Sequence, residues 1–600
     1  MKQQVSRDVI FDLPESFNVT DMLLKHVKSG KNPILFTRRN HKGEWKEVSA
    51  EDFYAQVKTL AKGLIGLGYQ HGDRIGLMSK TRYEWSLLDF AILFAGCITV
   101  PVYETSSPKQ VEWILTDSGT QAIFVENEEH EAAVIEIKDQ LPELKKMWII
   151  ENADFKELAE ASLKVSDEEF EKRRDQIKGS DVASIVYTSG TTGKPKGCML
   201  MHSNFTGIAV NCSKQFKSLL EYQRKELLFL PLAHVLARLI ALMSTNSGIN
   251  IAHTPNIKNL SRDLNEVKPH FILGVPRVFE KVYNTVKSTA KYSGKGMVFD
   301  RAEKIAIQYS KALSSNKKIP FRLRTEQKLF DKLLYSKILD NMGGNMVFAC
   351  SGGAPLAENI SHFFRGAGLP IVEGYGMTET CAPITFMSEK DLQPGTVGPP
   401  IPGVTVGIAD DYEILVKGVN VFKGYWNNEE ATNEATRDGW LHTGDLGFFD
   451  KNDNIHITGR KKEIIVTAGG KNVIPALLED RIRAHELVSQ CVVIGDQRPF
   501  ISAIVSLDAE VVPSWLEHHE LPLDTPISEL VEHPQILAEV QEAVDDANST
   551  VSHAEAIKKF KIIETDFTEE SGQLTPSLKI KRAKVLKDFQ DTVDDIYNKR

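Results

Sequence analysis

The stretch IVYTSGTTGKPKG at residues 185–197 decides the fold that this chain is expected to adopt. Its first three residues are apolar or aromatic and predict the end of a buried strand. The next ten residues contain three glycines, four hydroxyl side chains and two lysines, and nothing that could build a core. Glycine lets the backbone approach a ligand closely, while hydroxyls and lysines offer donors and positive charge to phosphate oxygens. The stretch therefore predicts a strand that ends in a phosphate-binding loop.

This loop differs from a Walker A loop, which needs four residues between its first Gly and a Gly-Lys pair followed by Ser or Thr. Here only two residues separate Gly190 from Gly193, and Pro195 follows Lys194. The alternative interpretation is a mobile surface loop, but linkers seldom follow a strand so abruptly. The candidate phosphate-binding residues are Thr188, Ser189, Gly190, Thr191, Thr192, Gly193, Lys194 and Lys196.

Length and composition limit the kind of protein this can be. A chain of 600 residues exceeds what one hydrophobic core usually serves, so two or more domains are expected. It is 42% hydrophobic and 26% charged, an ordinary globular balance. Its net charge of −9 argues against a general nucleic-acid binder.

Several features together predict a cytoplasmic protein. The N-terminus has no apolar signal region. The most apolar run, residues 85–102, is interrupted by Asp89, Gly96 and Pro101, so it predicts a core helix and strand rather than a membrane span. The six cysteines are scattered without a C-x-x-C pair, which suits a reducing compartment and gives no zinc or disulfide framework.

Residues 45–125 alternate between helix-like and strand-like segments. Apolar residues at helical spacing predict helices at 53–67 and 85–95, and short apolar runs predict strands at 74–78 and 98–102. Such alternation is typical of parallel sheets covered by helices. Ligands of these sheets bind at the carboxyl ends of the strands, which is where the phosphate-binding loop is expected.

Further strand-like segments also end in small or polar residues. Residues 347–355 (VFACSGGAP) run into a glycine turn, and residues 371–383 (IVEGYGMTETCAP) carry Tyr375, Thr378 and Glu379. Together with the phosphate-binding loop, they predict one composite ligand site.

Two other segments end at candidate substrate residues. Residues 227–234 predict an apolar strand that ends at His234, which is either structural or directed at the substrate. Residues 271–277 repeat the strand-then-turn form and contain Val275 and Pro276.

Residues 285–341 form an insertion of two predicted helical segments, which interrupts the alternation of strands and helices. We call it the helical insertion. In the second segment, five apolar residues are expected on one face: Leu329, Phe330, Leu333, Leu334 and Ile338. Residues 311–337 contain eight lysines or arginines against two acids, Glu326 and Asp331. This basic insertion is either a solvated helix surface or a contact for anionic lipid headgroups.

From residue 398 the alternation of helix-like and strand-like segments stops. Short β-segments with turns at 398–459 predict a meander or small barrel. Within it Asp445 either caps a turn or binds ribose hydroxyls. Basic residues then mark a domain boundary at 459–470, and a basic cluster at 579–584 lies near the C-terminus.

Six motifs in this order match a known family: YTSGTTGKPKG (187–197), SGGAP (351–355), YGMTET (375–380), WLHTGDLG (440–447), GRKKEIIVTAGGKN (459–472) and LTPSLKIKR (574–582). Over residues 45–585 the chain resembles the adenylate-forming (AMP-binding) superfamily of acyl-CoA synthetases. Four further features are similar to those of the long-chain fatty acyl-CoA synthetases in particular: PLAHVLAR, GVPRVFEKV, the helical insertion and NVIPALLED.

The expected fold is therefore α/β with two domains. A large N-terminal domain at 1–460 should contain two helix-covered sheets up to about residue 395 and the β-meander or barrel at about 396–460. A smaller, mobile α+β domain should occupy 461–600.

The resemblance implies two half-reactions at one site. A fatty-acid carboxylate attacks the α-phosphorus of ATP and gives acyl-AMP and pyrophosphate, and the thiol of coenzyme A then attacks the acyl carbonyl and releases AMP. ATP, Mg²⁺ and coenzyme A are the implied cofactors and substrates. Peripheral membrane contact through residues 311–337 and a homodimer are further expectations, whereas nucleic acid is not an expected partner.

The resemblance also implies roles for the residues of the composite site. Thr378 would bind the α-phosphate, Glu379 would hold Mg²⁺, Tyr375 would stack on adenine, and Asp445 would bind the ribose with Arg460 nearby. The remaining residues of the adenine pocket would be Gly352, Gly353, Ala354 and Gly376.

The C-terminal motifs carry the rest of the implied machinery. Lys579 aligns with the adenylation lysine of the family, in preference to Lys581 and Arg582, because it follows Thr-Pro-Ser-Leu. Lys462 occupies the hinge position, where many members have Asp and others Lys. The coenzyme A candidates are Gly469, Gly470 and Lys471, and the acyl-chain candidates are His234, Val275 and Pro276.

The sequence is also compatible with other functions. The chain could be an acyl-AMP ligase that loads an acyl carrier protein, or a medium-chain or aryl-acid CoA ligase. A non-catalytic nucleotide-binding or membrane-associated scaffold is a third alternative, and the presence of Lys579, Glu379 and Asp445 together argues against it.

Overall fold

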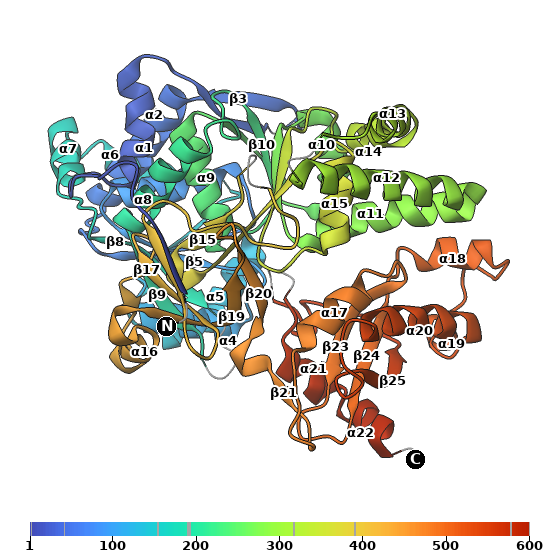
Figure 1. Cartoon of the computed structure of the whole chain (residues 1–600). Coiled ribbons are helices and arrows are strands. Elements are labelled where there is room, and N and C mark those ends of the chain that lie inside the picture. The colour runs from blue at the N-terminus through green and yellow to red at the C-terminus, as the bar shows by residue number, and fades with distance from the viewer. Residues whose placement is uncertain are drawn as a thin grey trace.

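The computed structural model describes residue 1 and residues 3–40, 42–152, 155–188, 194–315, 318–388, 392–575 and 579–598. A large body of sheets and helices carries a smaller C-terminal unit on one side (Figure 1). The α/β architecture predicted from the sequence is confirmed.

The first sheet of the body carries residues 185–197, the predicted phosphate-binding stretch. Its strand order is β18 (Gly424–Tyr425), β9 (Lys196–Met201), β8 (Val182–Thr188), β5 (Ile98–Val102), β4 (Arg74–Met78), β6 (Ala122–Val125) and β7 (Lys146–Ile149). Strands β8, β5, β4, β6 and β7 run parallel, whereas β9 returns antiparallel to β8 and β18 pairs antiparallel with β9. The phosphate-binding stretch therefore joins β8 to β9.

The second sheet has a parallel centre with antiparallel edges. Its order is β15 (Ala382–Phe386), β14 (Ile371–Met377), β13 (Phe348–Ser351), β12 (Phe271–Gly274), β10 (Lys225–Leu228), β11 (Asn250–His253), β2 (Ile34–Arg39) and β3 (Trp45–Ser49). Because β12, β13 and β14 are parallel neighbours, the polar residues after them meet at one edge. The predicted strand at 227–234 is shorter than expected, because β10 ends at Leu228 and His234 instead caps the next helix.

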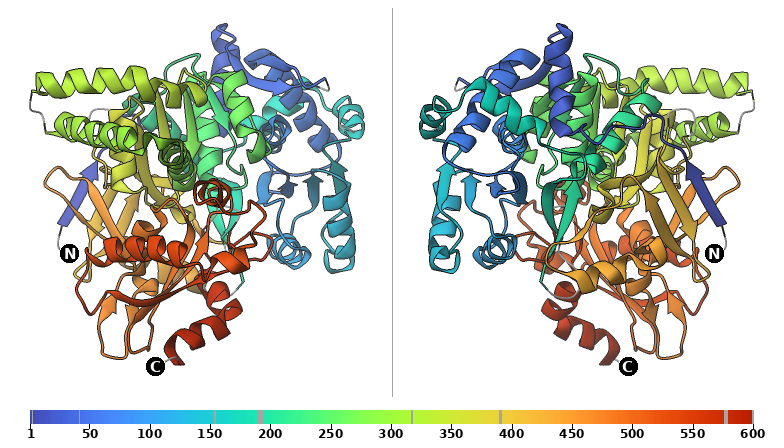
Figure 2. Two further views of the ribbon diagram at one scale, coloured as in Figure 1. Left: turned by 90° about the vertical axis from the view of Figure 1, so that its right-hand side faces the viewer. Right: turned by 90° about the vertical axis from the view of Figure 1, so that its left-hand side faces the viewer.

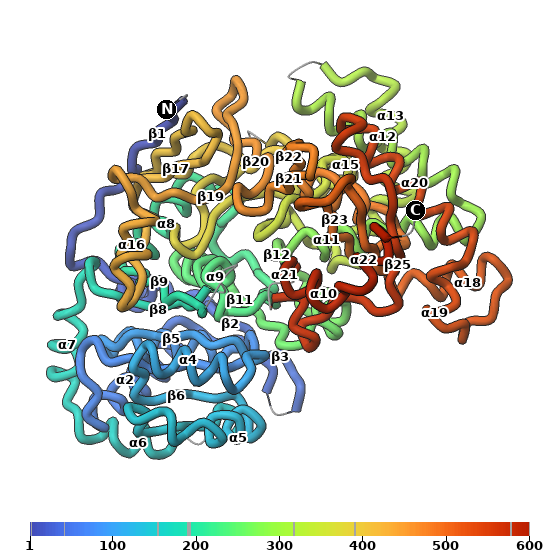
Figure 3. Tube along the Cα trace, turned by 90° about the horizontal axis from the view of Figure 1, so that it is seen from below, coloured from blue at the N-terminus to red at the C-terminus, as the bar shows by residue number. Residues whose placement is uncertain are grey.

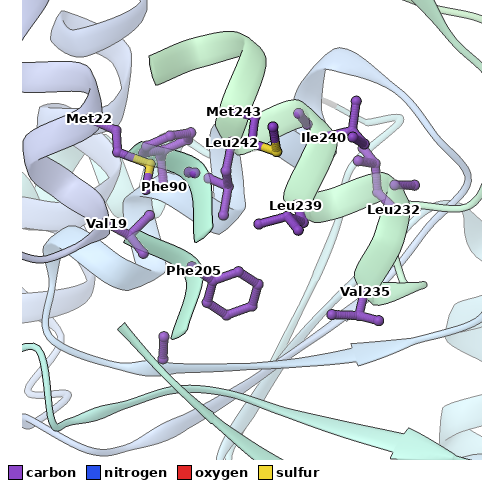
Figure 4. Packing of buried hydrophobic residues seen from close by; sticks show 14 of the residues in the cluster. Val19, Met22, Phe90, Phe205, Leu232, Val235, Leu239, Ile240, Leu242 and Met243 are labelled. Atoms are coloured by element: carbon purple, nitrogen blue, oxygen red, sulfur yellow. The ribbon is translucent and has the colours of Figure 1, made fainter. Parts of the chain in front are cut away.

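Helices cover these sheets. Those of the body outside the insertion are α1 (Val19–Ser29), α2 (Ala50–Gly66), α3 (Tyr83–Phe94), α4 (Pro108–Ser118), α5 (Glu128–Glu136), α6 (Lys156–Ser162), α7 (Asp167–Asp175), α8 (His202–Gln215), α9 (Val235–Ser247), α10 (Leu260–Val267), α15 (Glu358–Gly366) and α16 (Glu429–Ala435). Helices α2 and α3 confirm the two helices predicted from apolar spacing. Figure 4 shows Leu239 and Leu242 of α9 packed near Phe90 of α3 and Phe205 of α8.

A third sheet completes the body. Its antiparallel order is β1 (Gln3–Arg7), β16 (Val404–Ile408), β17 (Glu413–Gly418), β19 (Leu441–Phe449) and β20 (Ile455–Arg460). Of the two forms expected for this region, the strand order corresponds to a meander. Strand β1 comes from the start of the chain, which the sequence did not predict.

The helical insertion contains more helices than the two predicted. It comprises α11 (Pro276–Ala290), η3 (Lys291–Lys295), α12 (Gly296–Ser314), α13 (Phe321–Phe330), η4 (Asp331–Tyr335) and α14 (Ser336–Asn341), and it projects from the body (Figure 2). The expected single apolar face is wrong. Phe330 and Ile338 are buried, but Leu329 and Leu333 are 54% and 52% exposed. Phe330, Leu334 and Ile338 are spaced four residues apart and form the packed face, whereas Leu329 and Leu333 belong to the neighbouring row of the helix and lie beyond it.

The C-terminal unit has its own sheet and core. Strands β23 (Val488–Ile494), β24 (Ile501–Leu507) and β25 (Ile557–Ile563) are flanked by the hairpin β21 (Ile465–Val466) and β22 (Asn472–Val473). Its helices are α17 (Pro475–Arg483), α18 (Val512–His518), α19 (Ile527–Leu530), α20 (Pro534–Asn548), α21 (Arg582–Asp588) and α22 (Gln590–Asn598). Figures 1 and 3 show this unit beside the insertion. The boundary at residue 461 stays a prediction.

Among the described residues, no helix is both long enough and apolar enough to cross a bilayer. All six cysteines are buried and unpaired by disulfides, in keeping with the predicted absence of a disulfide framework.

A buried ion pair joins α3 and α9 at the centre of the body. Arg238 donates to both carboxylate oxygens of Asp89, with distances of 2.8 Å from Nε and 2.6 Å from Nη2. Both side chains are almost fully buried, so neither charge can be solvated if its partner is removed.

We expect Asp89→Asn to lower the free energy of unfolding by about 3–5 kcal/mol, because the Arg238 charge would stay buried without a counter-charge. The measurement is urea unfolding followed by tryptophan fluorescence. Lys156→Ala is the matched control, since its pair with Glu160 is exposed and should contribute less than about 1 kcal/mol. Equal stability of the two variants would contradict this account of the core.

Candidate active site

A cavity of 1410 Å³ brings together residues from the body and from the C-terminal unit. This volume exceeds the roughly 300–1,000 Å³ of a typical small-molecule site. The cavity therefore has room for more than one ligand or for an unusually long one.

One part of the cavity is apolar. Its lining there consists of aromatic, aliphatic and cysteine side chains from α8, α9, the second sheet and nearby loops: Cys212, Phe216, Leu219, Leu220, Leu236, Ile240, Met243, Phe271, Leu273, Phe348, Cys350 and Phe386. On α9, Leu236, Ile240 and Met243 follow the spacing of one helix face, so this helix separates the cavity from the core. Such a wall suits an extended apolar group.

A buried carboxylate lies behind the polar part. Asp445 of β19 accepts a hydrogen bond from the Tyr375 hydroxyl at 2.7 Å and one from Arg460 Nε at 2.8 Å. Burial and the carboxylate raise the pKa of Tyr375, and Asp445 raises the pKa of Arg460. Tyr375 and Arg460 line the cavity, whereas Asp445 does not. The carboxylate therefore fixes both side chains from behind.

Thr378 and Glu379 lie in the short helix η5 (Thr378–Thr380) directly after β14, and both line the cavity. The Glu379 carboxylate is nearly buried, and its Oε1 accepts a hydrogen bond from the Tyr425 hydroxyl at 2.7 Å. This places a hydroxyl and a hard oxygen ligand together at the polar part.

The glycines of the predicted adenine pocket follow β13 and lie within β14. Gly353 has φ +89°, a left-handed conformation that favours glycine. At Gly376 an added Cβ would lie 1.7 Å from the Ala382 carbonyl oxygen, so no larger residue fits. Gly352, Gly353 and Gly376 line the cavity, but Ala354 does not.

The phosphate-binding stretch is described only at its two ends. Thr188 and Lys196 face each other across β8 and β9 and line the cavity. Lys194 lies outside the cavity, with its Nζ 4.0 Å from the ring centre of Trp113. Five predicted residues lie outside the described part of the chain: Ser189, Gly190, Thr191, Thr192 and Gly193.

Lys579 reaches this cavity from the C-terminal unit. An added Cβ at Gly353 would lie 3.8 Å from its Cε. Desolvation lowers the pKa of Lys579, with Arg460 contributing in the same direction. His234 lines the same cavity, and burial, with a smaller contribution from Lys579, lowers its pKa to about 4. A neutral imidazole and the Lys579 amine therefore line the same cavity.

The basic neighbour Arg582 has a different environment from Lys579. Its Nη2 donates to both oxygens of Glu479 at 2.6 and 2.7 Å, and its Nη1 donates to the Val493 carbonyl oxygen at 2.8 Å. These bonds hold Arg582 within the C-terminal unit. Lys581 and Arg582 also line the cavity, so the choice of Lys579 as the adenylation lysine stays a prediction.

The other predicted residues are not all at the cavity. Lys462 lines it from the short helix η7 (Lys461–Glu463). Val275 and Pro276 do not, although an added Cβ at Gly353 would lie 3.9 Å from Val275 Cγ1. The predicted coenzyme A residues lie in the turn between β21 and β22, away from the cavity: Gly469, Gly470 and Lys471.

Ion pairs between the insertion and the C-terminal unit hold this arrangement. Arg277 of α11 pairs with Asp508 at 2.9 Å, and Lys281 of the same helix pairs with Glu510. Lys291 contacts Glu486 at 2.8 Å. These contacts fix the C-terminal unit in the position that brings Lys579 to the cavity.

Two kinds of residue could not be found from the sequence. Tyr425 and Trp113 contact the phosphate-binding stretch only because distant segments pair in space. The apolar residues of α8 and α9 that line the cavity also come from separate parts of the chain. The cluster GYW at 424–426, aromatic residues within a polar segment, is the one sequence signal that could have indicated Tyr425.

Comparison with known proteins identifies the kind of chain this resembles. Residues 27–426 match the family described as "AMP-binding enzyme", and residues 462–600 match "AMP-binding enzyme C-terminal domain". The chain is 44% identical over 600 residues to long-chain-fatty-acid–CoA ligase FadD15 of Mycobacterium tuberculosis, with 100% of both chains covered. It is 30% identical over 598 residues to long-chain-fatty-acid–CoA ligase ACSBG2 of Xenopus laevis, covering 92% of this chain and 80% of that protein.

Solved structures share the fold. A Mycobacterium tuberculosis fatty acyl CoA synthetase matches with a TM-score of 0.62 and 21% identity, covering 96% of this chain and 99% of the other. ATP-bound MatB from Rhodopseudomonas palustris matches with a TM-score of 0.69 and 21% identity, covering 96% and 100%.

Proposed function

Because this chain belongs to the AMP-binding enzyme family, we propose that it is an ATP-dependent ligase that activates a long-chain fatty acid. It forms acyl-AMP with release of pyrophosphate and then transfers the acyl group to coenzyme A. The observation that supports this most is the meeting of Lys579 with the polar residues around Tyr375 and Glu379, beside an extended apolar wall.

The first half-reaction brings a carboxylate to a polyanionic triphosphate, so electrostatic repulsion is a large part of its barrier. Fixed cations and donors that match the developing charge lower that barrier, and one such donor typically contributes roughly 3–4 kcal/mol. Lys579 would bridge the carboxylate and the α-phosphate, and Thr378 would donate to the α-phosphate. Lys196 and Thr188 would hold the departing pyrophosphate.

The nucleoside end is assigned to the residues around Asp445. Tyr375 would stack on adenine in a pocket floored by Gly352, Gly353 and Gly376, where close backbone approach is available. Asp445 would accept hydrogen bonds from the ribose hydroxyls. Because its carboxylate lies behind Tyr375 and Arg460 and does not line the cavity, one of these two side chains would have to move aside when ATP binds.

The residues at the polar part of the cavity fit a Mg²⁺ ion. Glu379 supplies a hard oxygen ligand that faces the cavity. Among the described residues, no group of three or more His, Cys, Asp and Glu side chains could enclose a metal. This suits Mg²⁺, which commonly binds one or two carboxylates and takes its other ligands from substrate phosphates and water. When bound, the ion would neutralise charge on the triphosphate.

The second half-reaction requires a different arrangement. In the structure Lys579 faces the cavity, while the turn that carries Gly469, Gly470 and Lys471 lies away from it. Rotation of the C-terminal unit about Lys462 would exchange these two elements and allow coenzyme A to enter. The present arrangement is therefore assigned to acyl-AMP formation.

The apolar wall favours a long acyl chain over a medium-chain or aryl acid, because it extends along both α8 and α9. Free coenzyme A is proposed as the acceptor, and loading of an acyl carrier protein is the alternative. Activity with a phosphopantetheinyl protein and none with coenzyme A would favour that alternative. A homodimer stays a prediction.

We also propose that the insertion contacts anionic lipid. The exposed side of α13 and η4 combines Phe321, 85% exposed, with Leu329 and Leu333. Three basic residues are also exposed on this side: Arg324, Lys328 and Lys332. They are spaced four residues apart, in the row of the helix next to the apolar residues. Glu326 pairs instead with Arg301 and Arg322. An apolar stripe flanked by cations is suited to a membrane surface.

The test of the proposed enzyme activity is coenzyme A ligation with acids from acetate to oleate. We expect the highest kcat/KM with long-chain acids. Lys579→Ala should lose pyrophosphate exchange by at least about a hundredfold, because it removes the bridging cation, yet largely retain thioester formation from preformed acyl-AMP. Lys587→Ala, a lysine of α21 outside the cavity lining, is the control. Equal loss in both half-reactions would contradict the role of Lys579.

The lipid contact is tested by sedimentation with phosphatidylglycerol and phosphatidylcholine vesicles at low and high salt. We expect binding to the anionic vesicles that weakens with salt. Lys328→Glu with Lys332→Glu should weaken it at least about tenfold, since each cation contributes about 1 kcal/mol. Phe321→Ser should also weaken binding, whereas Leu163→Ser, at an apolar residue 86% exposed elsewhere, should not. Binding that none of these variants changes would contradict the proposal.

A further inference from the structure

Tyr425 connects two of the groups assigned to the phosphate end of the nucleotide. Its hydroxyl donates to Glu379 Oε1 at 2.7 Å. Its ring centre lies 5.1 Å from Lys196 Nζ, within range of a cation–π interaction. One side chain thus contacts both the carboxylate assigned to Mg²⁺ and a lysine assigned to phosphate.

The register of the first sheet fixes the second of these contacts. In the antiparallel pair β18 and β9, Tyr425 lies opposite Cys198. Side chains two residues apart on a strand share a face, so Lys196 and Cys198 point to the same side. Lys196 is therefore the diagonal neighbour of Tyr425, a separation that long and aromatic side chains can span.

The surroundings of Tyr425 hold its ring in place. The Phe422 ring packs edge-on against it at a centroid distance of 4.9 Å. The Tyr425 amide donates to Thr432 Oγ1 at 2.9 Å. The preceding Gly424 has φ +138°, and an added Cβ would lie 2.8 Å from Thr432 Cγ2. The backbone and ring of Tyr425 are thus fixed independently of the cavity.

The hydrogen bond restricts how the Glu379 carboxylate can turn. Rotation about the last side-chain torsion of a glutamate is otherwise broad. With Oε1 held by the tyrosine hydroxyl, Oε2 accepts no hydrogen bond from the described residues, and Glu379 lines the cavity. The geometry leaves this oxygen available to a cation that enters with the triphosphate.

We infer that Tyr425 is a positioning residue for the first half-reaction, which joins the metal-binding carboxylate Glu379 to the phosphate-binding lysine Lys196. This inference rests on the proposed function. Its hydroxyl orients Glu379 toward the cation of MgATP, and its ring restrains the ammonium group of Lys196 beside the same phosphates. Tyr425 itself contacts no reacting atom.

The experiment compares Tyr425→Phe with Tyr425→Leu. The phenylalanine keeps the ring under Lys196 and removes only the hydroxyl, whereas leucine removes both. ATP binding is measured by calorimetry at increasing Mg²⁺ concentration, and pyrophosphate exchange is measured over the same range. We expect Tyr425→Phe to raise the Mg²⁺ concentration needed for half-maximal binding about tenfold, the typical effect of losing a hydrogen bond to a charged group.

Other readouts should separate the two contacts. ATP affinity without Mg²⁺ should be nearly unchanged in Tyr425→Phe and weaker in Tyr425→Leu, because only leucine removes the ring beneath Lys196. Thioester formation from preformed acyl-AMP should stay within about twofold of the unmodified protein in both variants. Tyr283→Phe is the matched control, since it removes a tyrosine–glutamate hydrogen bond, to Glu303, within the insertion. It should leave the Mg²⁺ dependence unchanged.

A double-mutant cycle with Glu379→Gln keeps the test independent of stability. If Tyr425 acts through Glu379, Tyr425→Phe should have no further effect on the Mg²⁺ dependence in that background. Additive effects, or an unchanged Mg²⁺ dependence in Tyr425→Phe, would overturn the inference. Failure of the unmodified protein to exchange pyrophosphate with any acid would instead overturn the proposed function, because calorimetry of ATP does not require an acid substrate.

Discussion

The buried carboxylate of Asp445 is the constraint on which the site depends. Removal of its charge from water is costly unless the carboxylate is hydrogen-bonded and paired, and the Tyr375 hydroxyl and the Arg460 guanidinium meet that requirement. These partners come from β14 of the second sheet and β20 of the third. Arg460 also immediately precedes η7, the start of the connection to the C-terminal unit. The same interaction therefore shapes the proposed nucleoside pocket and anchors the proposed hinge.

The position of the C-terminal unit relative to the body decides which of the two proposed half-reactions the cavity can support. Lys579 lies at the cavity because the pairs from Arg277, Lys281 and Lys291 hold the unit against α11 and η3. The Lys281–Glu510 pair is exposed on both sides and contributes modestly, whereas Asp508 and Glu486 are only 12% and 4% exposed. We propose that an arrangement held by a few ion pairs suits a unit that must stay for one half-reaction and move for the next.

Most of the fold and much of the candidate site could be predicted from the sequence, because the patterns that indicate them lie within short stretches of the chain. Strand ends followed by glycine and polar residues placed Tyr375, Thr378 and Glu379 at one edge. The contact between Tyr425 and Glu379 could not be predicted, since it arises from the pairing of β18 with β9, far apart in the chain. The exposure of Leu329 could not be predicted, since apolar spacing shows which residues can share a helix face but not how much of that face the neighbouring elements cover.

We propose that this arrangement performs acyl-AMP formation and must change before coenzyme A reacts. Zero-length carbodiimide coupling of Lys281 to Glu510, done in the presence of MgATP and verified by mass spectrometry, would fix the arrangement covalently. A variant with Lys281→Gln and Lys291→Gln, treated identically, controls for other modified carboxylates. We predict that the cross-linked protein exchanges pyrophosphate at close to the normal rate but makes almost no acyl-CoA. Acyl-CoA formation at the rate of the untreated protein would contradict the account.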